Sequence, residues 1–441
     1  MKEQKYYYIC TYGCQMNVHE SEKLAGILQQ RGFLPAKEQK NADIIVFNTC
    51  CIRESAEQKI LGNIGAVKPL KKEKKGLIVA VCGCMSQQTK MAEFLKQKFP
   101  FINIIFGANN VEFFGEYLDT YLSQQKYQNM VLPNENYQEN ENGVKIERDS
   151  TMHAFVNIMY GCNNFCSYCI VPYVKGREQS RDAAEIIKEV QNLIKMNYKV
   201  ITLLGQNVNS YHSSLDGKDV DFADLMQILC DIPGEFELRF MSSHPKDLNS
   251  KVIDTIAKNE KISKYIHLPV QSGSNDVLKR MNRNYTREKY LGLIQEIKQK
   301  IPNVILTTDI IVGFPGETEQ DYLDTVDLLQ KVRYSNAFIF MYSKRKGTPA
   351  EKMDNQIPIE VKRQRIHDLL AIEHNISDEI FTSLKGTTQR ALIEEETDKN
   401  YIAKLQCGKV VKLNKQNKTN VGSFVDVKIL DYKNGDLIAE L

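Results

Sequence analysis

Residues Ala154–Cys169 read AFVNIMYGCNNFCSYC, an apolar run that leads directly into three closely spaced cysteines. The apolar run predicts a buried β-strand that ends near Tyr160. Cys162, Cys166 and Cys169 then follow in the spacing C-x3-C-x2-C. Three thiolates at this spacing can hold three irons of a 4Fe–4S cube and leave the fourth iron open for a substrate or cosubstrate. A zinc site or a closed electron-transfer cluster is the alternative, but zinc sites usually need two pairs of ligands, and no second pair flanks this one.

The chain around this stretch alternates between strand-like and helical segments. Six apolar runs of strand length lie between residues 153 and 342, separated by amphipathic helical stretches. About six such units in a row predict a full or partial (β/α) barrel, whose ligand-binding residues lie at the C-terminal ends of its strands. The predicted strands are Ala154–Tyr160, Val200–Leu204, Phe236–Met241, Tyr265–Val270, Val304–Val312 and Ala337–Tyr342.

Polar and glycine residues come directly after several of these predicted strands. Each alone is consistent with an ordinary turn, but their shared position at one barrel mouth favours ligand binding. Arg177 and Arg181 follow the cysteines and suit either an anionic ligand or a surface ion pair. The candidates for contacts to a bound cosubstrate are Gly205, Gln206, Ser242, Gln271 and Ser272.

The N-terminal part of the chain predicts an open parallel sheet covered by helices on both faces, because four strand-like runs alternate with helical segments. Cys14, Cys50 and Cys84 each follow the end of one of these runs. Ligands of open α/β sheets lie at this edge, so the sequence predicts a second three-thiolate iron–sulfur site there. Cys51 is expected to point elsewhere, because adjacent strand-edge side chains diverge. The runs are Tyr6–Tyr12, Asp43–Asn48, Leu77–Cys82 and Ile102–Phe106.

The remaining segments differ in composition. Residues 124–150 are polar and predict a linker. Short strand-like runs near the C-terminus predict a small antiparallel β-barrel, a fold that often binds nucleic acid. These runs are Gln389–Ile393, Tyr401–Leu405, Lys409–Leu413 and Phe424–Leu430. The predicted parts are thus an N-terminal open-sheet domain with the second cysteine set (1–123), a linker (124–150), the central barrel (151–378) and the C-terminal barrel (379–441).

Composition sets limits on the setting of the protein. The 441 residues are 42% hydrophobic and 26% charged, with a net charge of +3, as in ordinary soluble globular proteins. No secretory signal and no apolar stretch of about 20 residues is visible, so we expect a cytoplasmic protein without a membrane partner. A cytoplasmic compartment keeps thiols reduced, so the 11 cysteines are interpreted as metal ligands and core residues rather than disulfides.

Several motifs together resemble one family over essentially the whole chain. The chain resembles the methylthiotransferases, a radical S-adenosylmethionine (SAM) family with an N-terminal cluster domain, a central barrel and a C-terminal TRAM domain, and within it the tRNA-modifying MiaB-type branch. Cys51 departs from the pattern, which has a small polar residue there. The matching segments are Thr11–Asn17, Asn48–Cys50, Ile52–Glu54, Gly83–Cys84, Asn157–Glu178, His267–Ser274 and Asp309–Thr318.

The resemblance implies a reaction. Such enzymes methylthiolate carbon 2 of N6-isopentenyladenosine beside the anticodon of tRNA, and they use SAM both as methyl donor and as radical source. It also implies two [4Fe–4S] clusters: one on Cys162, Cys166 and Cys169 that binds SAM, and a second on Cys14, Cys50 and Cys84 that carries the sulfur. The five strand-end residues are then SAM contacts, no residue is assigned as a general base, and the partners are tRNA, an electron donor such as flavodoxin or ferredoxin, and a sulfur source.

Two other readings stay open from the sequence. One is a methylthiotransferase that acts on threonylcarbamoyl-adenosine in tRNA or on an aspartate of a ribosomal protein, although the opening motif Tyr12–Asn17 favours the isopentenyl branch. The other is a non-catalytic RNA-binding protein with structural zinc. It predicts zinc instead of iron, and structural zinc sites are closed by four ligands.

Overall fold

The computed structural model describes residues 4–51, 54–130, 145–415 and 419–441. The chain folds into two compact units, and the division passes through the cysteine loop. The first unit comprises residues 1–151, 159–165 and 169–179, and the second comprises residues 152–158, 166–168 and 180–441. Among the described residues, no helix has the length and apolar character needed to cross a bilayer.

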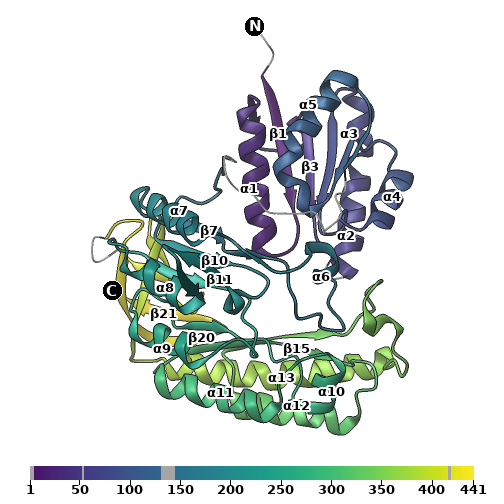
Figure 1. The fold of residues 1–441 in the computed structure, drawn as a ribbon. Helices are drawn as coiled ribbons and strands as arrows, with labels where there is room; N and C mark the ends of the chain where they lie inside the picture. The colour runs from purple at the N-terminus through teal and green to yellow at the C-terminus, as the bar shows by residue number, and fades with distance from the viewer. Residues whose placement is uncertain (1–3, 52–53, 131–144, 416–418) are drawn as a thin grey trace. The chain divides into compact units, whose positions relative to one another are not determined.

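The first unit is built on a six-stranded sheet in which every neighbouring pair is parallel, in the order β2-β1-β3-β4-β5-β6. This confirms the predicted open parallel sheet (Figure 1). The strands are β1 (Lys5–Thr11), β2 (Phe33–Pro35), β3 (Ile44–Thr49), β4 (Ile78–Gly83), β5 (Ile104–Phe106) and β6 (Gln128–Met130). Because β6 lies within residues 124–150, the sheet extends into the segment predicted as a linker, of which residues 131–144 lie outside the described residues.

Helices cover both faces of this sheet, because successive strand residues point to opposite sides. Ile44 and Val46 of β3 pack with α1 and α5, whereas Ile45 and Phe47 pack with α2, α4 and α6. Both faces of β3 and β4 are therefore buried, as expected for central strands of a parallel sheet. The helices are α1 (Gln15–Gln30), α2 (Glu54–Ala66), α3 (Lys68–Glu73), α4 (Thr89–Lys98), α5 (Phe114–Gln124) and α6 (Val171–Lys175).

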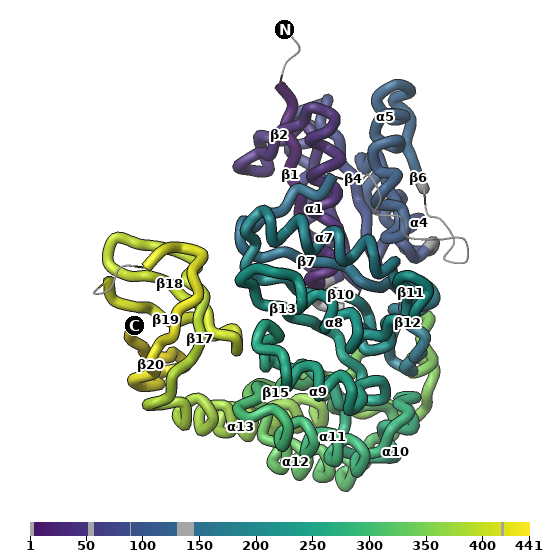
Figure 2. The backbone as a smooth tube through the Cα atoms, turned by 60° about the vertical axis from the view of Figure 1, so that its left-hand side comes forward, coloured from purple at the N-terminus to yellow at the C-terminus, as the bar shows by residue number. Residues whose placement is uncertain are grey.

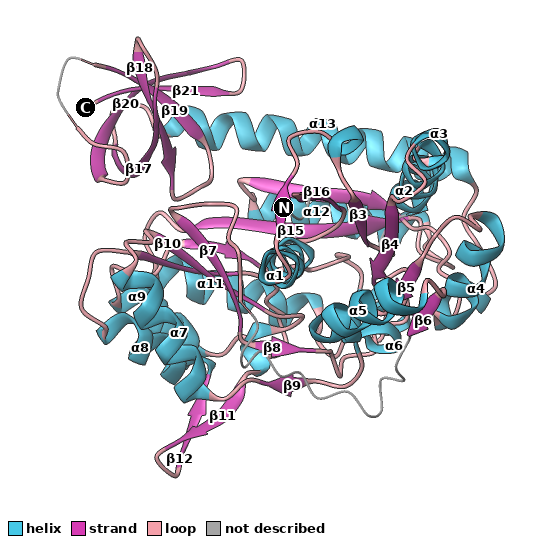
Figure 3. Ribbon diagram, turned by 90° about the horizontal axis from the view of Figure 1, so that it is seen from above, coloured by secondary structure: helices cyan, strands magenta, loops and turns pink. Residues whose placement is uncertain are grey.

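The second unit contains two three-stranded parallel sheets, ordered β13-β10-β7 and β14-β15-β16. A parallel bridge between Leu238 and Ile262 continues the first sheet toward β14, so the six predicted strands form a partial barrel. Figure 3 shows β15 and β16 running beside the long helix α13. The strands are β7 (His153–Asn157), β10 (Val200–Leu204), β13 (Glu237–Phe240), β14 (Tyr265–His267), β15 (Ile305–Val312) and β16 (Asn336–Met341).

The connections between these strands are mainly helical, as βα units require. Short strands lie on either side of the cysteine loop in the sequence, and a small hairpin precedes α8. The helices are α7 (Ala183–Lys195), α8 (Phe222–Asp231), α9 (Ser250–Lys258), α10 (Asn275–Arg280), α11 (Arg287–Lys300), α12 (Glu319–Val332) and α13 (Ile359–Ser383); the short strands are β8 (Met159–Tyr160), β9 (Gln179–Ser180), β11 (His212–Leu215) and β12 (Lys218–Asp221).

The C-terminal segment forms a closed five-stranded barrel in the order β17-β18-β19-β21-β20 (Figure 2). It is antiparallel except for the β19–β21 pair, which is parallel. Val411 is buried inside it while its neighbour Val410 is 48% exposed, so the adjacent valines still obey strand alternation. The strands are β17 (Thr388–Glu396), β18 (Asn400–Leu405), β19 (Val410–Asn414), β20 (Phe424–Lys433) and β21 (Asp436–Glu440).

Candidate functional site

The N-terminal cysteines lie at one edge of the six-stranded sheet. Cys14 caps the start of α1 directly after β1, Cys50 follows β3, and Cys84 follows β4. The three strands are parallel and adjacent in the sheet, so their C-terminal ends lie side by side. The structure therefore places these cysteines at the strand ends where the sequence predicts them.

Two glycines hold the loops of this edge close together. Gly13 has a φ of +114°, and a Cβ there would lie 2.8 Å from the Cβ of Cys50. Gly83 has a φ of +99°, and a Cβ there would lie 2.3 Å from the carbonyl oxygen of Thr49. Only glycine tolerates both the left-handed backbone and the close approach, so the cysteine loops depend on these two positions.

The electrostatics of this edge favour a thiolate at Cys84. A hydrogen bond from Cys51 is the main effect that lowers the pKa of Cys84 to about 6, against the opposing effect of burial, and the ammonium of Lys175 acts in the same direction as Cys51. Burial, and then the neighbouring Cys84, raises the pKa of Cys14 above its ordinary value. Thiolate is the form of cysteine that binds metal, so Cys84 fits the donor chemistry of an iron–sulfur group.

The position of Cys51 differs from the expectation. Its side chain was predicted to point elsewhere, but it is buried and hydrogen-bonded to Cys84. β3 ends at Thr49, so the strict alternation of a strand no longer applies at Cys50 and Cys51. Within the described residues, no three Cys, His, Asp or Glu side chains surround a common point as ligands of a metal ion, so the ligand assignment stays a prediction.

The second cysteine set lies in the loop between β8 and α6. None of Cys162, Cys166 and Cys169 forms a disulfide. The backbone N–H of Cys162 donates to the carbonyl of Gly176 at 3.2 Å. The amide of Asn164 donates to the Cys162 sulfur at 3.5 Å. Three closely spaced cysteines on a loop held by these hydrogen bonds fit the donor set of a cluster.

The two candidate arginines after this loop make different contacts. The guanidinium of Arg181 donates to the carbonyl of Asn157 at 2.6 Å and to Glu189 at 3.0 Å, so Arg181 forms an ion pair on its own unit. The guanidinium of Arg177 lies 4.6 Å from the ring centre of Phe165. Phe165 has a φ of +46°, a backbone conformation that costs energy outside glycine and that occurs often at functional loops.

The five predicted cosubstrate contacts lie beyond the strand ends of the barrel. Gly205 and Gln206 follow β10, Ser242 follows β13, and Gln271 and Ser272 follow β14. Ser242 and Gln271 adopt left-handed backbone conformations, with φ of +69° and +71°. Gln271 also forms a parallel bridge with Ile310 of β15, which fixes its loop. Ser272 differs from the others, because its buried hydroxyl accepts from the N–H of Ser274 and contacts the hydroxyl of Thr325.

The same loops contain buried polar atoms without a hydrogen-bond partner in the part of the chain that the structure describes. They belong to residues that follow Gln206 and Ser242 by one to three positions, so the predicted strand ends point to this part of the chain. Burial, helped by the charge of Arg283, lowers the pKa of His244 to about 2, so this imidazole is neutral. The atoms are Asn207 Oδ1, Asn209 Nδ2, Ser243 Oγ and His244 Nε2. Buried polar atoms are normally satisfied, so these atoms mark a place for a polar ligand.

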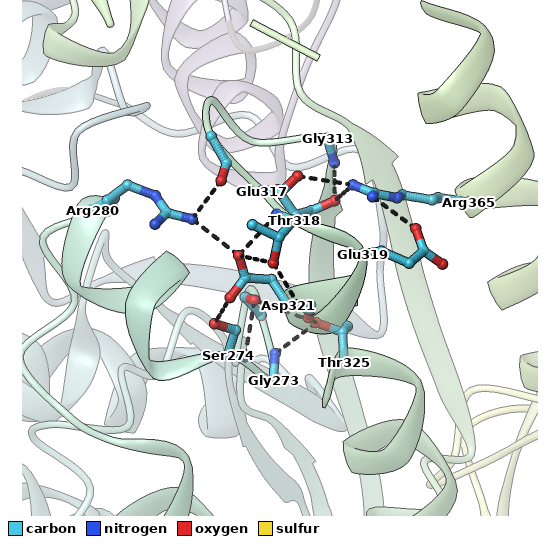
Figure 4. Close-up of polar contacts among 12 residues, drawn as sticks. Gly273, Ser274, Arg280, Gly313, Glu317, Thr318, Glu319, Asp321, Thr325 and Arg365 are labelled. Carbon is cyan, nitrogen blue, oxygen red and sulfur yellow. Dashed lines mark hydrogen bonds and ion pairs between the residues drawn. The ribbon is translucent and has the colours of Figure 1, made fainter. Parts of the chain in front are cut away.

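A network of ion pairs and hydrogen bonds braces the loops that follow β14 and β15 (Figure 4). The carboxylate of Glu317 accepts from the N–H of Gly313 at 2.8 Å and pairs with Arg365 of α13 at 2.6 Å. Asp321 accepts from the hydroxyls of Thr318 and Ser274, which links α12 to α10. A hollow of about 510 Å³ borders this network, but its arginines pair with its own carboxylates and carbonyls. The network therefore holds loop positions instead of offering charges to a ligand.

Three family models match the chain. The Radical SAM superfamily matches residues 156–329, Uncharacterized protein family UPF0004 matches residues 6–107, and the TRAM domain matches residues 382–441. Among solved structures, the chain is similar to the radical S-adenosylmethionine methyltransferase TsrM from Kitasatospora setae with cobalamin and a [4Fe-4S] cluster bound. The TM-score is 0.56 at 13% sequence identity, and the match covers 75% of this chain and 73% of that chain. This likeness shows the fold alone.

Curated relatives match along nearly the whole length. A protein of Clostridium tetani is 49% identical over 96% of this chain and 93% of the relative. Proteins of Carboxydothermus hydrogenoformans and Clostridium perfringens are each 46% identical, over 98% and 100% of this chain and 98% of each relative. All three relatives carry the name tRNA-2-methylthio-N(6)-dimethylallyladenosine synthase.

Proposed function

The chain belongs to the family of tRNA-2-methylthio-N(6)-dimethylallyladenosine synthases, and on that premise we propose that its two cysteine sets hold two [4Fe–4S] clusters. The protein is a radical SAM enzyme that adds a methylthio group to carbon 2 of N6-dimethylallyladenosine (isopentenyladenosine) in tRNA. The observation that carries the two-cluster proposal is the placement of Cys14, Cys50 and Cys84 at the ends of adjacent parallel strands.

The first cluster is assigned to Cys162, Cys166 and Cys169, which lie within the region that matches the Radical SAM superfamily. With SAM bound, this cluster supplies the one-electron chemistry that an unactivated C–H bond at carbon 2 of the base requires. The protein's part is to hold and shield the cosubstrate. The loops after β10 and β13 are suited to this, because buried polar atoms of Asn207 and His244 there have no protein partner among the described residues.

The second cluster belongs to Cys14, Cys50 and Cys84 and would supply the sulfur, with SAM as the methyl donor. The chain's contribution is geometric and electrostatic. Gly13 and Gly83 let the three loops approach, and the hydrogen bond from Cys51 favours the thiolate of Cys84. The immediate sulfur source and an electron donor such as flavodoxin or ferredoxin are further partners, and iron–sulfur chemistry suits a reducing cytoplasm.

The C-terminal barrel is proposed to contact the tRNA. Lys412 of β19 and Lys428 of β20 are exposed on barrel strands that match the TRAM domain. Exposed lysines neutralise phosphates independently of the nucleotide sequence, so they are suited to bind the tRNA backbone beside the anticodon.

An anaerobic turnover assay with isopentenylated tRNA tests the function, with nucleoside mass spectrometry as the readout. We expect 2-methylthio-N6-isopentenyladenosine from the reconstituted enzyme and none from the Cys162→Ala variant. A Cys230→Ala variant is the matched control, because Cys230 is a buried residue of α8 outside both sets and should leave turnover intact. An iron-loaded enzyme that methylthiolates only threonylcarbamoyl-adenosine would contradict the assignment.

A further inference from the structure

Arg283 is a buried cation that, in the part of the chain the structure describes, has no acidic partner. Arg283 lies in the loop between α10 and α11, and the residue is only 7% exposed. Its Nη2 donates to the carbonyl oxygen of Pro269 at 2.6 Å, and its Nε donates to the hydroxyl of Tyr285 at 2.9 Å. Both partners are neutral. Among the described residues, no carboxylate lies within ion-pair distance of this guanidinium, whereas buried Arg365 pairs with Glu317.

The third nitrogen of the Arg283 guanidinium, Nη1, donates to a cysteine of the predicted SAM cluster. This nitrogen lies 3.6 Å from the sulfur of Cys166, which is itself buried. A guanidinium stays protonated in proteins, and a buried charge is costly unless an opposite charge balances it. The neighbouring imidazole of His244, whose ring centre lies 5.8 Å from that of Tyr285, is neutral and provides no such charge. Of the hydrogen-bond partners of Arg283 among the described residues, Cys166 is thus the one that becomes anionic when it binds iron.

We propose that Arg283 is a positioning residue whose guanidinium balances the negative charge at Cys166 and thereby raises the reduction potential of the SAM-binding cluster. The inference rests on the proposed function, because it requires a cluster on Cys162, Cys166 and Cys169. Hydrogen bonds to the ligand sulfurs and the net charge around a cluster set its potential. Reduction adds one negative charge to the cluster, so a fixed cation that donates to a ligand sulfur stabilises the reduced form.

The structure also offers a purely mechanical role, which makes different predictions. Arg283 ties the Pro269 loop to Tyr285, and the hydroxyl of Tyr285 donates in turn to the carbonyl of Val270 at 2.8 Å. If these hydrogen bonds were the whole role of Arg283, Tyr285→Phe and Arg283→Met would have similar effects on stability. Those effects would be the same with and without a bound cluster. If charge balance is the role, only Arg283→Met alters the potential, because Tyr285→Phe leaves the guanidinium in place.

The test is a redox titration of the anaerobically reconstituted full-length chain, followed by electron paramagnetic resonance. All variants are made in a chain in which Cys14, Cys50 and Cys84 are replaced by alanine, so that only the SAM-binding cluster is observed. We expect Arg283→Met to shift the reduction equilibrium at least tenfold toward the oxidised cluster, which is about 59 mV for a one-electron couple. Tyr285→Phe should leave the potential in place. An Arg283→Met chain that holds its cluster at an unchanged potential would overturn the proposal.

Iron content and apo-protein stability decide the case in which Arg283→Met holds no cluster. In the apo chain the charge of Arg283 is uncompensated, so Arg283→Met should melt no lower than the parent, and Arg283→Lys should restore iron loading. If the Arg283→Met apo-protein unfolds, the shape of the arginine and not its charge is required, and the proposal is wrong. The same conclusion follows if a folded Arg283→Lys chain also binds no iron. If the parent chain itself holds no iron–sulfur cluster, the proposed function fails and not this inference alone.

Discussion

Gly83 shows how one residue controls the position of a predicted ligand. Its left-handed φ of +99° turns the chain at the last residue of β4, so that Cys84 follows at the sheet edge. The sequence was sufficient to place Cys84, because a cysteine after an apolar run is visible by position. It was insufficient for Cys51, because the direction of a side chain beyond a strand end depends on backbone bends that alternation does not describe.

We expect Gly83→Ala to destabilise the first unit. The new Cβ would lie 2.3 Å from the carbonyl oxygen of Thr49 on a left-handed backbone, so the loss of unfolding free energy should be at least about 1–3 kcal/mol. Iron loading should fall as well, because the Cys84 loop must shift. Denaturant unfolding and iron analysis of the reconstituted protein measure the two effects.

Gly62→Ala is the matched control for that substitution. Gly62 lies in α2 with no atom within 4 Å of the added Cβ, so alanine should stabilise the helix by about 0.5–1 kcal/mol. Equal losses of stability in the two variants would show that the backbone of Gly83 is not special.

At the level of elements, α13 does more than connect the partial barrel to the C-terminal barrel. Its Arg365 pairs with Glu317, which accepts from the backbone of Gly313 after β15. Its Lys362 packs where a Cβ of Gly313 would lie, with 2.3 Å between that position and the lysine Cγ. The sequence predicts the strands and the Gly313 loop from their patterns, but a pair 48 residues apart leaves no local signal. Likewise, β21 and its parallel pairing with β19 depend on closure of the barrel and not on its own residues.

Breaking this pair should weaken the packing of α13 on the loop between β15 and α12. Arg365→Met leaves the carboxylate of Glu317 buried without its partner, and we expect a loss of about 3–5 kcal/mol in unfolding free energy. Adding Glu317→Gln to Arg365→Met should recover part of that loss, because the orphan charge is removed. Urea unfolding of the single and double variants provides the comparison.

A control for this prediction lies two residues further along the chain, at the first residue of α12. Glu319 also pairs with Arg365, at 3.0 Å, but its side chain is 70% exposed. Glu319→Gln should change stability by less than about 0.5 kcal/mol, as surface pairs usually do. If it costs as much as Arg365→Met, burial is not the reason for the strength of the Glu317 pair.

For the whole molecule, the predicted order of an open-sheet part, a partial barrel and a small C-terminal barrel is confirmed by the fold and by the three family matches. Strand–helix alternation and cysteine spacing were enough to predict that order, because each part carries its own periodic pattern. The six cysteines belong to two sets that the sequence separates by 78 residues, from Cys84 to Cys162. The central claim is that each set holds one [4Fe–4S] cluster. The sequence implies these clusters through the cysteine positions alone.

Iron and acid-labile sulfide content after anaerobic reconstitution tests that claim most directly. Two cubes require about eight irons per chain, and replacing Cys14, Cys50 and Cys84 by alanine should leave about four. Cys230→Ala should keep all eight. A triple variant with undiminished iron, or a parent chain that binds only zinc, would contradict the account.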